Sequence, residues 1–241
     1  CRHSRASFEI LSSQGAPLAP FVTQTRSSGV AAATYTGTGS ATNFGHGLSQ
    51  APDMVIVKRR DGTPSWQVFH TSLGGGKSIE LDNTGAAGST TSVWNNTAPT
   101  SSVVHIGTHS GTNTSSGTYV AYSFHSVEGY SKIGSYTGNG SSNGTFVYCG
   151  FRPAWVMFKR TDTTGNWWMI DNKRDITNQM SNVLLADSSG AEFNTGTGWP
   201  GIDYVSNGFK LRGSAGGINA SSGSYIFLAF AEAPFKSANA R

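Results

Sequence analysis

The sequence predicts an all-β protein of two tandem β-sandwich modules. Three observations support this class: charged residues make up only 12% of the 241 residues, glycine occupies 31 positions, and long phrases recur at spacings of 101 to 106 residues. Few charges and many turn-forming residues disfavour both long helices and disordered tails. They are typical of many short strands joined by tight turns.

Two repeated phrases define the internal duplication. DMVIVKRRD over 53–61 returns as AWVMFKRTD over 154–162, and SSGTYVAYSF over 115–124 returns as SSGSYIFLAF over 221–230. A drift of a few residues in spacing is what insertions in turns produce when the strands are retained. We therefore expect one ancestral module to be present twice.

These repeats set the predicted domain boundaries. Residues 35–133 form module 1 and residues 134–241 form module 2. Residues 1–34 contain Pro, Gln, Ser and Ala without a sustained periodicity. Such a composition indicates an N-terminal arm or connector.

Breaker residues divide module 2 into about seven short strands, which is typical of a β-sandwich. The expected strands are 145–149, 154–160, 166–171, 182–186, 202–205, 208–212 and 224–230. Asn207-Gly208, between IDYVS and FKLR, predicts a hairpin turn in which both residues adopt positive φ.

Two of these strands are apolar at consecutive positions, AWVMF over 154–158 and YIFLAF over 225–230. A strand with one face in water alternates, whereas a continuous apolar run implies cover on both faces. We expect these strands to be central, with the sister module or another chain covering the second face. The same runs favour self-assembly.

The motifs also carry a family resemblance. GYSKIGSYTGNGSSNGTFVYCGFRPAWVMFKRTD, NWWMIDNKRD, SNGFKLR and SYIFLAFAEAPFKSANAR in module 2 closely resemble a domain common in tail-fibre and other virion proteins of marine bacteriophages. GHGLSQAPDMVIVKRRD, SWQVFH and TYVAYSF in module 1 look like the preceding copy. The resemblance spans roughly residues 35–241 and implies a virion-associated β-sandwich. It also implies an outline similar to lectin-like jelly rolls, and a homotrimer is expected by analogy with phage fibres. It brings no catalytic motif and names no ligand.

The repeated phrase itself is interpreted as scaffold. Lys159 and Arg160 are consecutive in a strand, so their side chains leave opposite faces and cannot form one cationic clamp. Asp162 lies two residues beyond Arg160, where it can accept N–H groups of a turn or pair with the guanidinium. The first copy has the same residues in the same order, at Lys58, Arg59 and Asp61.

No pattern of catalytic or metal-binding residues stands out, and no cofactor is indicated. Asp171 and Asp175 are four residues apart in a probable turn and do not form the close pair that marks a glycosidase. His105 and His109 would lie ~13 Å apart on an extended strand, which is too far to share a metal ion. Cys149 lies in the apolar run FVYCGF and is expected to be a small buried hydrophobic residue.

The best candidate for ligand binding is a pair of tryptophans in loop-like stretches. Trp94 (SVWNNT) and Trp199 (GTGWPG) lie among Asn, Thr, Gly and Pro, and Asn96, Asp203 and Tyr204 are their neighbours in sequence. An aromatic face covers the C–H groups of a sugar while amides and hydroxyls bond its hydroxyl groups. The alternative is that each Trp folds back and fills the edge of its sandwich, and its recurrence in both copies favours that alternative.

The net charge of +4 comes from scattered basic residues, with the densest cluster at Lys58-Arg59-Arg60. This pattern does not indicate nucleic-acid binding. No stretch approaches the ~18–20 apolar residues of a membrane span.

Taken together, the residues and the resemblance favour a non-enzymatic phage virion protein. The expected role is attachment of a fibre or spike domain to bacterial surface polysaccharide, with other virion proteins as further partners. Such a protein is assembled in the host cytoplasm and exposed outside the cell on the virion. A purely structural capsid-decorating or fibre-shaft module, a polysaccharide depolymerase and, more distantly, a secreted cellular lectin remain the alternatives.

Overall fold

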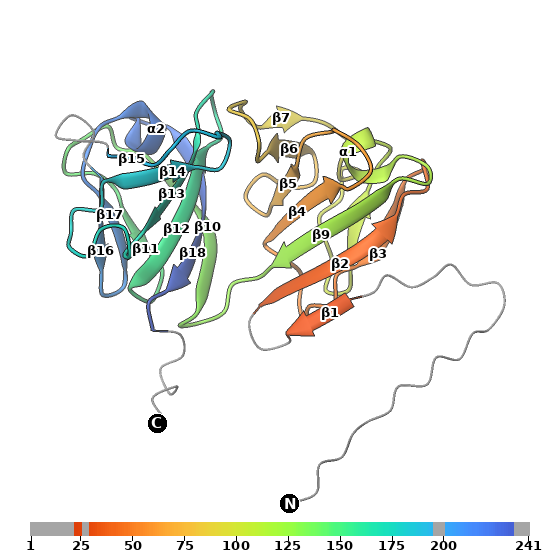
Figure 1. The fold of residues 1–241 in the computed structure, drawn as a ribbon, viewed down its shortest axis with the longest axis horizontal. Coiled ribbons are helices and arrows are strands. Elements are labelled where there is room, and N and C mark those ends of the chain that lie inside the picture. Colours follow the sequence, from red (N-terminus) through yellow and green to blue (C-terminus); the bar gives the residue numbers. More distant parts are fainter. Residues whose placement is uncertain (1–21, 26–28, 195–200, 234–241) are drawn as a thin grey trace, which may run out of the picture.

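In the computed structural model, which describes residues 22–25, 29–194 and 201–233, the chain forms two layered β-units that lie side by side (Figure 1). Antiparallel sheets account for nearly all of the regular structure. The predicted all-β sandwich class is therefore confirmed. The two described helices are single turns of four residues each, and no described helix could cross a membrane.

Module 1 has a seven-stranded sheet in the order β1-β2-β9-β4-β5-β6-β7 and a two-stranded sheet, β3-β8. Its elements are β1 (Val22–Thr25), β2 (Val30–Thr36), β3 (Thr42–Gly45), β4 (Met54–Arg59), β5 (Gln67–His70), β6 (Lys77–Glu80), β7 (Gly88–Ser89), β8 (Val103–Ile106), α1 (Ser110–Asn113) and β9 (Thr118–Phe124). Strands β1 and most of β2 fall inside the segment expected to be an arm. Module 1 thus begins earlier than expected, because the VAAAT run of β2 pairs along β9.

Module 2 has a six-stranded sheet in the order β10-β18-β12-β13-β14-β15 and a three-stranded sheet, β11-β17-β16. Its elements are β10 (Ser131–Thr137), β11 (Phe146–Tyr148), β12 (Pro153–Arg160), β13 (Trp167–Asp171), β14 (Asn182–Leu185), β15 (Phe193–Asn194), β16 (Ile202–Val205), β17 (Gly208–Leu211), α2 (Gly216–Asn219) and β18 (Ser224–Ala231). All seven strands expected in this module are present. Strands β10 and β15 were not expected.

The large sheets of the two modules have matching strand orders. The series β2-β9-β4-β5-β6-β7 in module 1 corresponds in chain order to β10-β18-β12-β13-β14-β15 in module 2. Strand β16 has no counterpart among the described strands of module 1. The duplication as an origin of the chain stays a prediction, while the shared strand order is a feature of the fold.

Strands β12 and β18 are central in their sheet and buried on both faces, as their continuous apolar sequences predict. In β18, Tyr225, Phe227 and Ala229 belong to the core of module 2. The alternate residues Ile226 and Leu228 belong to a different cluster, which also contains residues of module 1. One strand therefore supplies two apolar layers.

That second cluster, here called the intermodule layer, joins the two large sheets face to face. Its buried members are Met54, Ile56, Val68 and Ile79 from module 1 and Ile133, Met157, Trp167, Ile226 and Leu228 from module 2. Fully burying one such side chain contributes roughly 1.5–3 kcal/mol. The expectation that the two modules pack together agrees with this layer.

The expected hairpin between β16 and β17 is present, but its turn differs from the prediction. Val205 pairs with Gly208, so the two turn residues are Ser206 and Asn207. Neither Asn207 nor Gly208 has a positive φ. Gly208 lies instead on β17, where an added Cβ would come within 2.1 Å of the Val147 carbonyl oxygen. Close approach of β11, and not turn conformation, requires glycine at this position.

We expect Trp167→Ala to reduce the free energy of unfolding by about 3–5 kcal/mol, because large-to-small changes in a core leave a cavity. Trp167 is 1% exposed and its indole N–H donates to the Glu80 carbonyl oxygen at 2.7 Å. Trp66→Ala, at the corresponding position of module 1, is the matched control and should cost less than half as much since Trp66 is only half-buried. Urea unfolding measures both, and equal losses would contradict this role of Trp167.

The intermodule region should also lose stability in acid. His70 is fully buried, and burial lowers the pKa of its imidazole to about 4 although Asp53 opposes the shift. Neutral His70 therefore stabilises the fold above its ordinary pKa near 6.5, and this contribution is lost as pH falls from there towards 4. Between pH 7 and 4.5, the free energy of unfolding of His70→Met should therefore fall by about 2–3 kcal/mol less than that of the wild type. Urea unfolding at several pH values measures this contribution, and a His70→Met protein with the pH profile of the wild type would contradict it.

Candidate binding site

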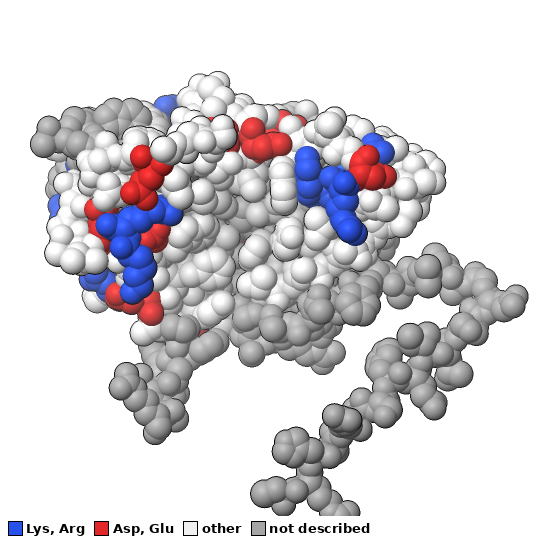
Figure 2. All heavy atoms as spheres, viewed as in Figure 1, with Lys and Arg blue, Asp and Glu red and all other residues white. Residues whose placement is uncertain are grey.

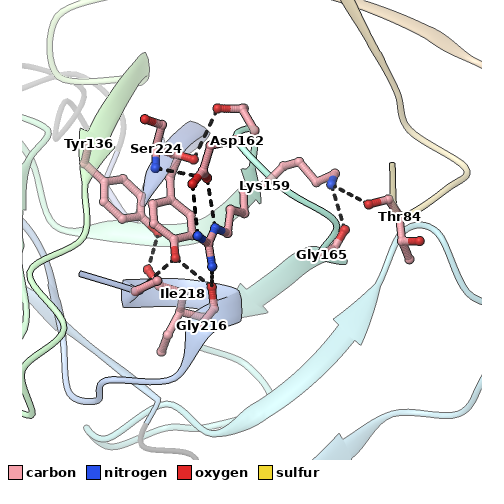
Figure 3. Close-up of polar contacts among 12 residues, drawn as sticks. Thr84, Tyr136, Lys159, Asp162, Gly165, Gly216, Ile218 and Ser224 are labelled. Atoms are coloured by element: carbon pink, nitrogen blue, oxygen red, sulfur yellow. Dashed lines mark hydrogen bonds and ion pairs between the residues drawn. The ribbon is translucent and has the colours of Figure 1, made fainter. Parts of the chain in front are cut away.

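The repeated Lys-Arg-x-Asp phrase is a hydrogen-bonded clasp that belongs to the scaffold (Figure 3). Lys159 is completely buried and donates to the carbonyl oxygens of Gly165 at 2.7 Å and Thr84 at 3.1 Å. Thr84 belongs to module 1, so this ammonium links the modules, and burial lowers its pKa to about 8. Lys58 makes the corresponding contact within module 1, to the Pro64 carbonyl oxygen at 2.5 Å.

The arginine and aspartate of the phrase point away from the lysine and pair with each other. Arg160 donates to both oxygens of Asp162 at 2.9 Å, and to the Gly216 carbonyl oxygen of α2 at 3.2 Å. Asp162 also accepts the backbone N–H of Ser224 (Figure 3). The hydrogen bond from Arg160 lowers the pKa of Asp162 to about 2. The Arg–Asp pair predicted from sequence is therefore confirmed for this copy, whereas the N–H that Asp162 accepts comes from β18 and not from the following turn.

Module 1 repeats this arrangement with its own residues. Arg59 pairs with Asp61 at 2.8 Å. In each module two tyrosine hydroxyls also donate to carbonyls of the short helix, as Tyr136 does to Ile218 and Tyr225 does to Gly216 in module 2. A set of contacts that recurs in both modules supports a structural role.

The acidic residues of the DNKRD turn are engaged in local contacts. Asp171 pairs with Arg174 at 3.1 Å. Asp175 accepts the backbone N–H groups of Ser181 and Asn182 at 2.6 and 2.7 Å. Among the residues that the structure describes, no group of three or more His, Cys, Asp and Glu side chains could hold a metal ion.

The structure separates the residues expected to bind a ligand. Trp94 is completely buried in the core of module 1, edge-on to Phe69, and Tyr204 is completely buried in the core of module 2. The prediction that these two rings face a ligand is wrong, and the alternative of a Trp that fills the sandwich holds for Trp94. Asn96 is exposed in module 1, and Asp203 lies on β16 of module 2. Trp199 lies outside the described residues.

Asp203 nevertheless belongs to a surface with exposed aromatic rings, the outer face of the β11-β17-β16 sheet. Along β11 the side chains alternate: Val147 is buried in the core, while Phe146 and Tyr148 on either side are 44% and 63% exposed. Residues i and i+2 of a strand share a face about 7 Å apart. Two aromatic side chains therefore stand in a row on one rigid strand.

Polar residues of the neighbouring strands complete this face. Phe146 lies opposite Lys210 on β17, which lies opposite Asp203 on β16. Asp203 is held by Arg212, whose Nε and Nη2 both approach one carboxylate oxygen at 2.5 Å. We call the set Phe146, Tyr148, Asp203, Lys210 and Arg212 the aromatic platform.

Module 1 lacks this platform although its small sheet has the same inward pattern. TNFGH over 42–46 and TFVYC over 145–149 share the burial of their third and fifth residues. Asn43 and Gly45 thus stand where module 2 has Phe146 and Tyr148. Sequence reasoning missed these two aromatics because FVYCGF was taken as one apolar run. Alignment of the two small-sheet segments would have found them.

A polar hollow also lies between the two modules. Its cavity volume is about 420 Å³, and its lining comes from the turn after β5 and from β10, β18 and the end of β12, namely Ser72, Leu73, Ser135, Tyr136, Thr137, Thr161, Ser224, Tyr225 and Ile226. The two tyrosines are buried, so the hollow offers hydroxyl groups but no exposed ring. The aromatic platform is therefore the better-equipped candidate.

Charged side chains do not form a broad patch on the face drawn in Figure 2, where small groups of both signs stand on a mostly uncharged surface. Several of the basic residues are in ion pairs, including Arg152 with Glu232 and Arg174 with Glu192. The surface is thus suited to a ligand recognised by shape and hydrogen bonds more than by bulk charge.

The fold and this platform define an all-β sandwich protein with an exposed aromatic face. Residues 13–234 match the model of one protein family, described as "Domain of unknown function (DUF7483)", and the chain belongs to that family. No curated protein and no solved structure matches the chain.

Trp94→Ala should behave as a core substitution. We expect it to lower the free energy of unfolding by about 3–5 kcal/mol, since a fully buried aromatic leaves a large cavity. Asn96→Gly, two residues away on an exposed turn at φ 50°, is the control and should change stability little. Thermal unfolding measures both variants, and a Trp94→Ala protein of unchanged Tm would contradict the burial of this ring.

Proposed function

We propose that the chain is a non-enzymatic attachment domain of a phage virion, which binds bacterial surface polysaccharide through the aromatic platform. The observation that carries the proposal is the pair of rings at Phe146 and Tyr148, 44% and 63% exposed on one strand. The virion context rests on the resemblance of both modules to phage tail-fibre domains. On such a particle the domain would be exposed on the virion surface, outside the cell.

The platform has the physical features that sugar recognition requires. An exposed aromatic face covers the C–H groups of a pyranose, and neighbouring polar groups bond its hydroxyls. Asp203 and Arg212 provide an acceptor and donors at the edge of the rings, and their ion pair holds both side chains in place. Because β11 is hydrogen-bonded to β17 over its length, little backbone ordering is needed on binding.

A single platform of this size gives a weak contact. Attachment gains strength when several copies act together, because later contacts are intramolecular. A homotrimer, as proposed for this chain, would carry three platforms. Other virion proteins are the proposed partners at the opposite end of the fibre.

A purely structural virion module is the second candidate. The burial of Trp94 and the clasp that joins the modules favour it, since both stabilise the fold without serving a ligand. The two candidates make opposite predictions for the surface of β11. A structural module needs no exposed rings there, whereas an adhesin does.

The deciding experiment replaces the platform with the residues of module 1. In Phe146→Asn/Tyr148→Ser, asparagine matches Asn43 and serine replaces glycine to limit backbone freedom. We expect binding to a bacterial glycan array and to whole host cells to fall roughly 5- to 150-fold, because each of the two stacking contacts contributes about 0.5–1.5 kcal/mol. Tm should change by little.

Tyr122→Ser is the matched control, because Tyr122 is also an exposed aromatic strand residue, 37% exposed on β9 of module 1. It should bind as the wild type does. Equal binding by the platform variant, or no binding by the wild type to any cell or glycan, would favour the purely structural role.

A further inference from the structure

We infer that the aromatic platform selects acidic saccharides, and that Lys210 recognises the anionic group. This inference rests on the proposed function and names the ligand class of the same site. The observation behind it is a lysine that lies directly opposite an exposed ring and has no acidic partner among the residues that the structure describes.

The position of Lys210 follows from the register of the small sheet. Lys210 pairs with Phe146 across β11 and β17. Directly opposite residues on one face have Cβ atoms about 4.5–5.5 Å apart. A sugar ring stacked on Phe146 therefore has its equatorial substituents within reach of the lysine ammonium.

The ammonium of Lys210 keeps donors free for a ligand. Its one hydrogen bond among the described residues is to the Gly144 carbonyl oxygen, at 2.5 Å. An ammonium has three N–H donors, so two remain. The carbonyl contact leaves the charge unneutralised and holds the side chain against β11.

The only acid of the platform is already engaged. Asp203 lies between Lys210 and Arg212 and is paired with Arg212 through two guanidinium nitrogens. The platform thus has two cationic side chains and one carboxylate, which leaves one positive charge. A sugar with one carboxylate or phosphate supplies the matching negative charge, and a neutral sugar leaves it without a partner.

Module 1 is again the internal comparison. His105 occupies the position of Lys210, opposite Asn43, so module 1 has neither the ring nor a permanent cation there. The ring and the lysine occur together in module 2. Binding of one ligand by both side chains explains why they occur together, since stacking and charge recognition would act on the same sugar unit.

The test is a glycan array of acidic bacterial polysaccharide fragments with the full chain as the probe. Each uronic-acid fragment is printed beside its carboxyl-reduced form, in which the carboxylate has become a primary alcohol. Each phosphorylated fragment is printed beside its dephosphorylated form, which separates the two sources of negative charge. The variants are Lys210→Gln, Arg60→Gln as a control in the basic cluster Lys58-Arg59-Arg60 of module 1, and Phe146→Asn/Tyr148→Ser.

We expect the wild type to bind the acidic member of a pair roughly 5- to 10-fold more tightly, the range of one charge-assisted hydrogen bond at a partly exposed site. Lys210→Gln should remove this preference while retaining the binding of the reduced form, and Arg60→Gln should keep it. The preference should also shrink as salt is raised, because the pair is exposed to screening.

Equal binding of acidic and reduced fragments by the wild type would overturn the selection of acidic sugars and leave the attachment role intact. A preference for the acidic fragments that survives in Lys210→Gln would overturn the assignment of this recognition to Lys210. Binding to no fragment, or binding that survives in Phe146→Asn/Tyr148→Ser, would overturn the platform itself and the proposed function with it.

Discussion

The apolar layer between the two large sheets is the constraint on which the rest of the molecule depends. It covers the outer face of β12 and β18, whose inner face already belongs to the core of module 2. Since Trp167 and the Lys159 clasp both reach module 1, the two sandwiches are fastened by apolar and polar contacts together. With much of the large sheets buried against each other, the small sheets are left with an outer face in water.

The strands could be predicted from the sequence because their apolar periodicity reports burial directly. Consecutive apolar residues in β12 and β18 indicated two covered faces, and both faces are covered. The layer that covers them was harder to assign, because a pattern shows that a partner exists and does not identify it. The repeated phrases helped here, since a sister module of the same chain is always present at high local concentration.

The candidate site was less predictable, because loop composition does not say where a side chain points. SVWNNT has the polar neighbours of an exposed Trp, but Trp94 turns inward while Asn95 and Asn96 adopt positive φ and face water. Those two residues form the turn that places the indole in the core. Conversely, the apolar sequence predicts Phe146 and Tyr148 to be core residues, unless the alternation of exposed and buried positions around Val147 is recognised.

Two modules with the same strand order in their large sheets offer an internal comparison that a single domain lacks. Contacts present in both copies, such as the Arg–Asp pairs and the tyrosine hydroxyls, are required by the fold they share. A surface that differs between the two modules is not required by the shared fold, so its residues are determined by another constraint. The outer face of the small sheet is such a surface: the same strand carries Asn43 and Gly45 in one module and two exposed rings in the other. Exposed aromatics lower solubility and add little to stability. The pair of rings on the small sheet of module 2 alone is therefore the feature on which the proposed binding role rests.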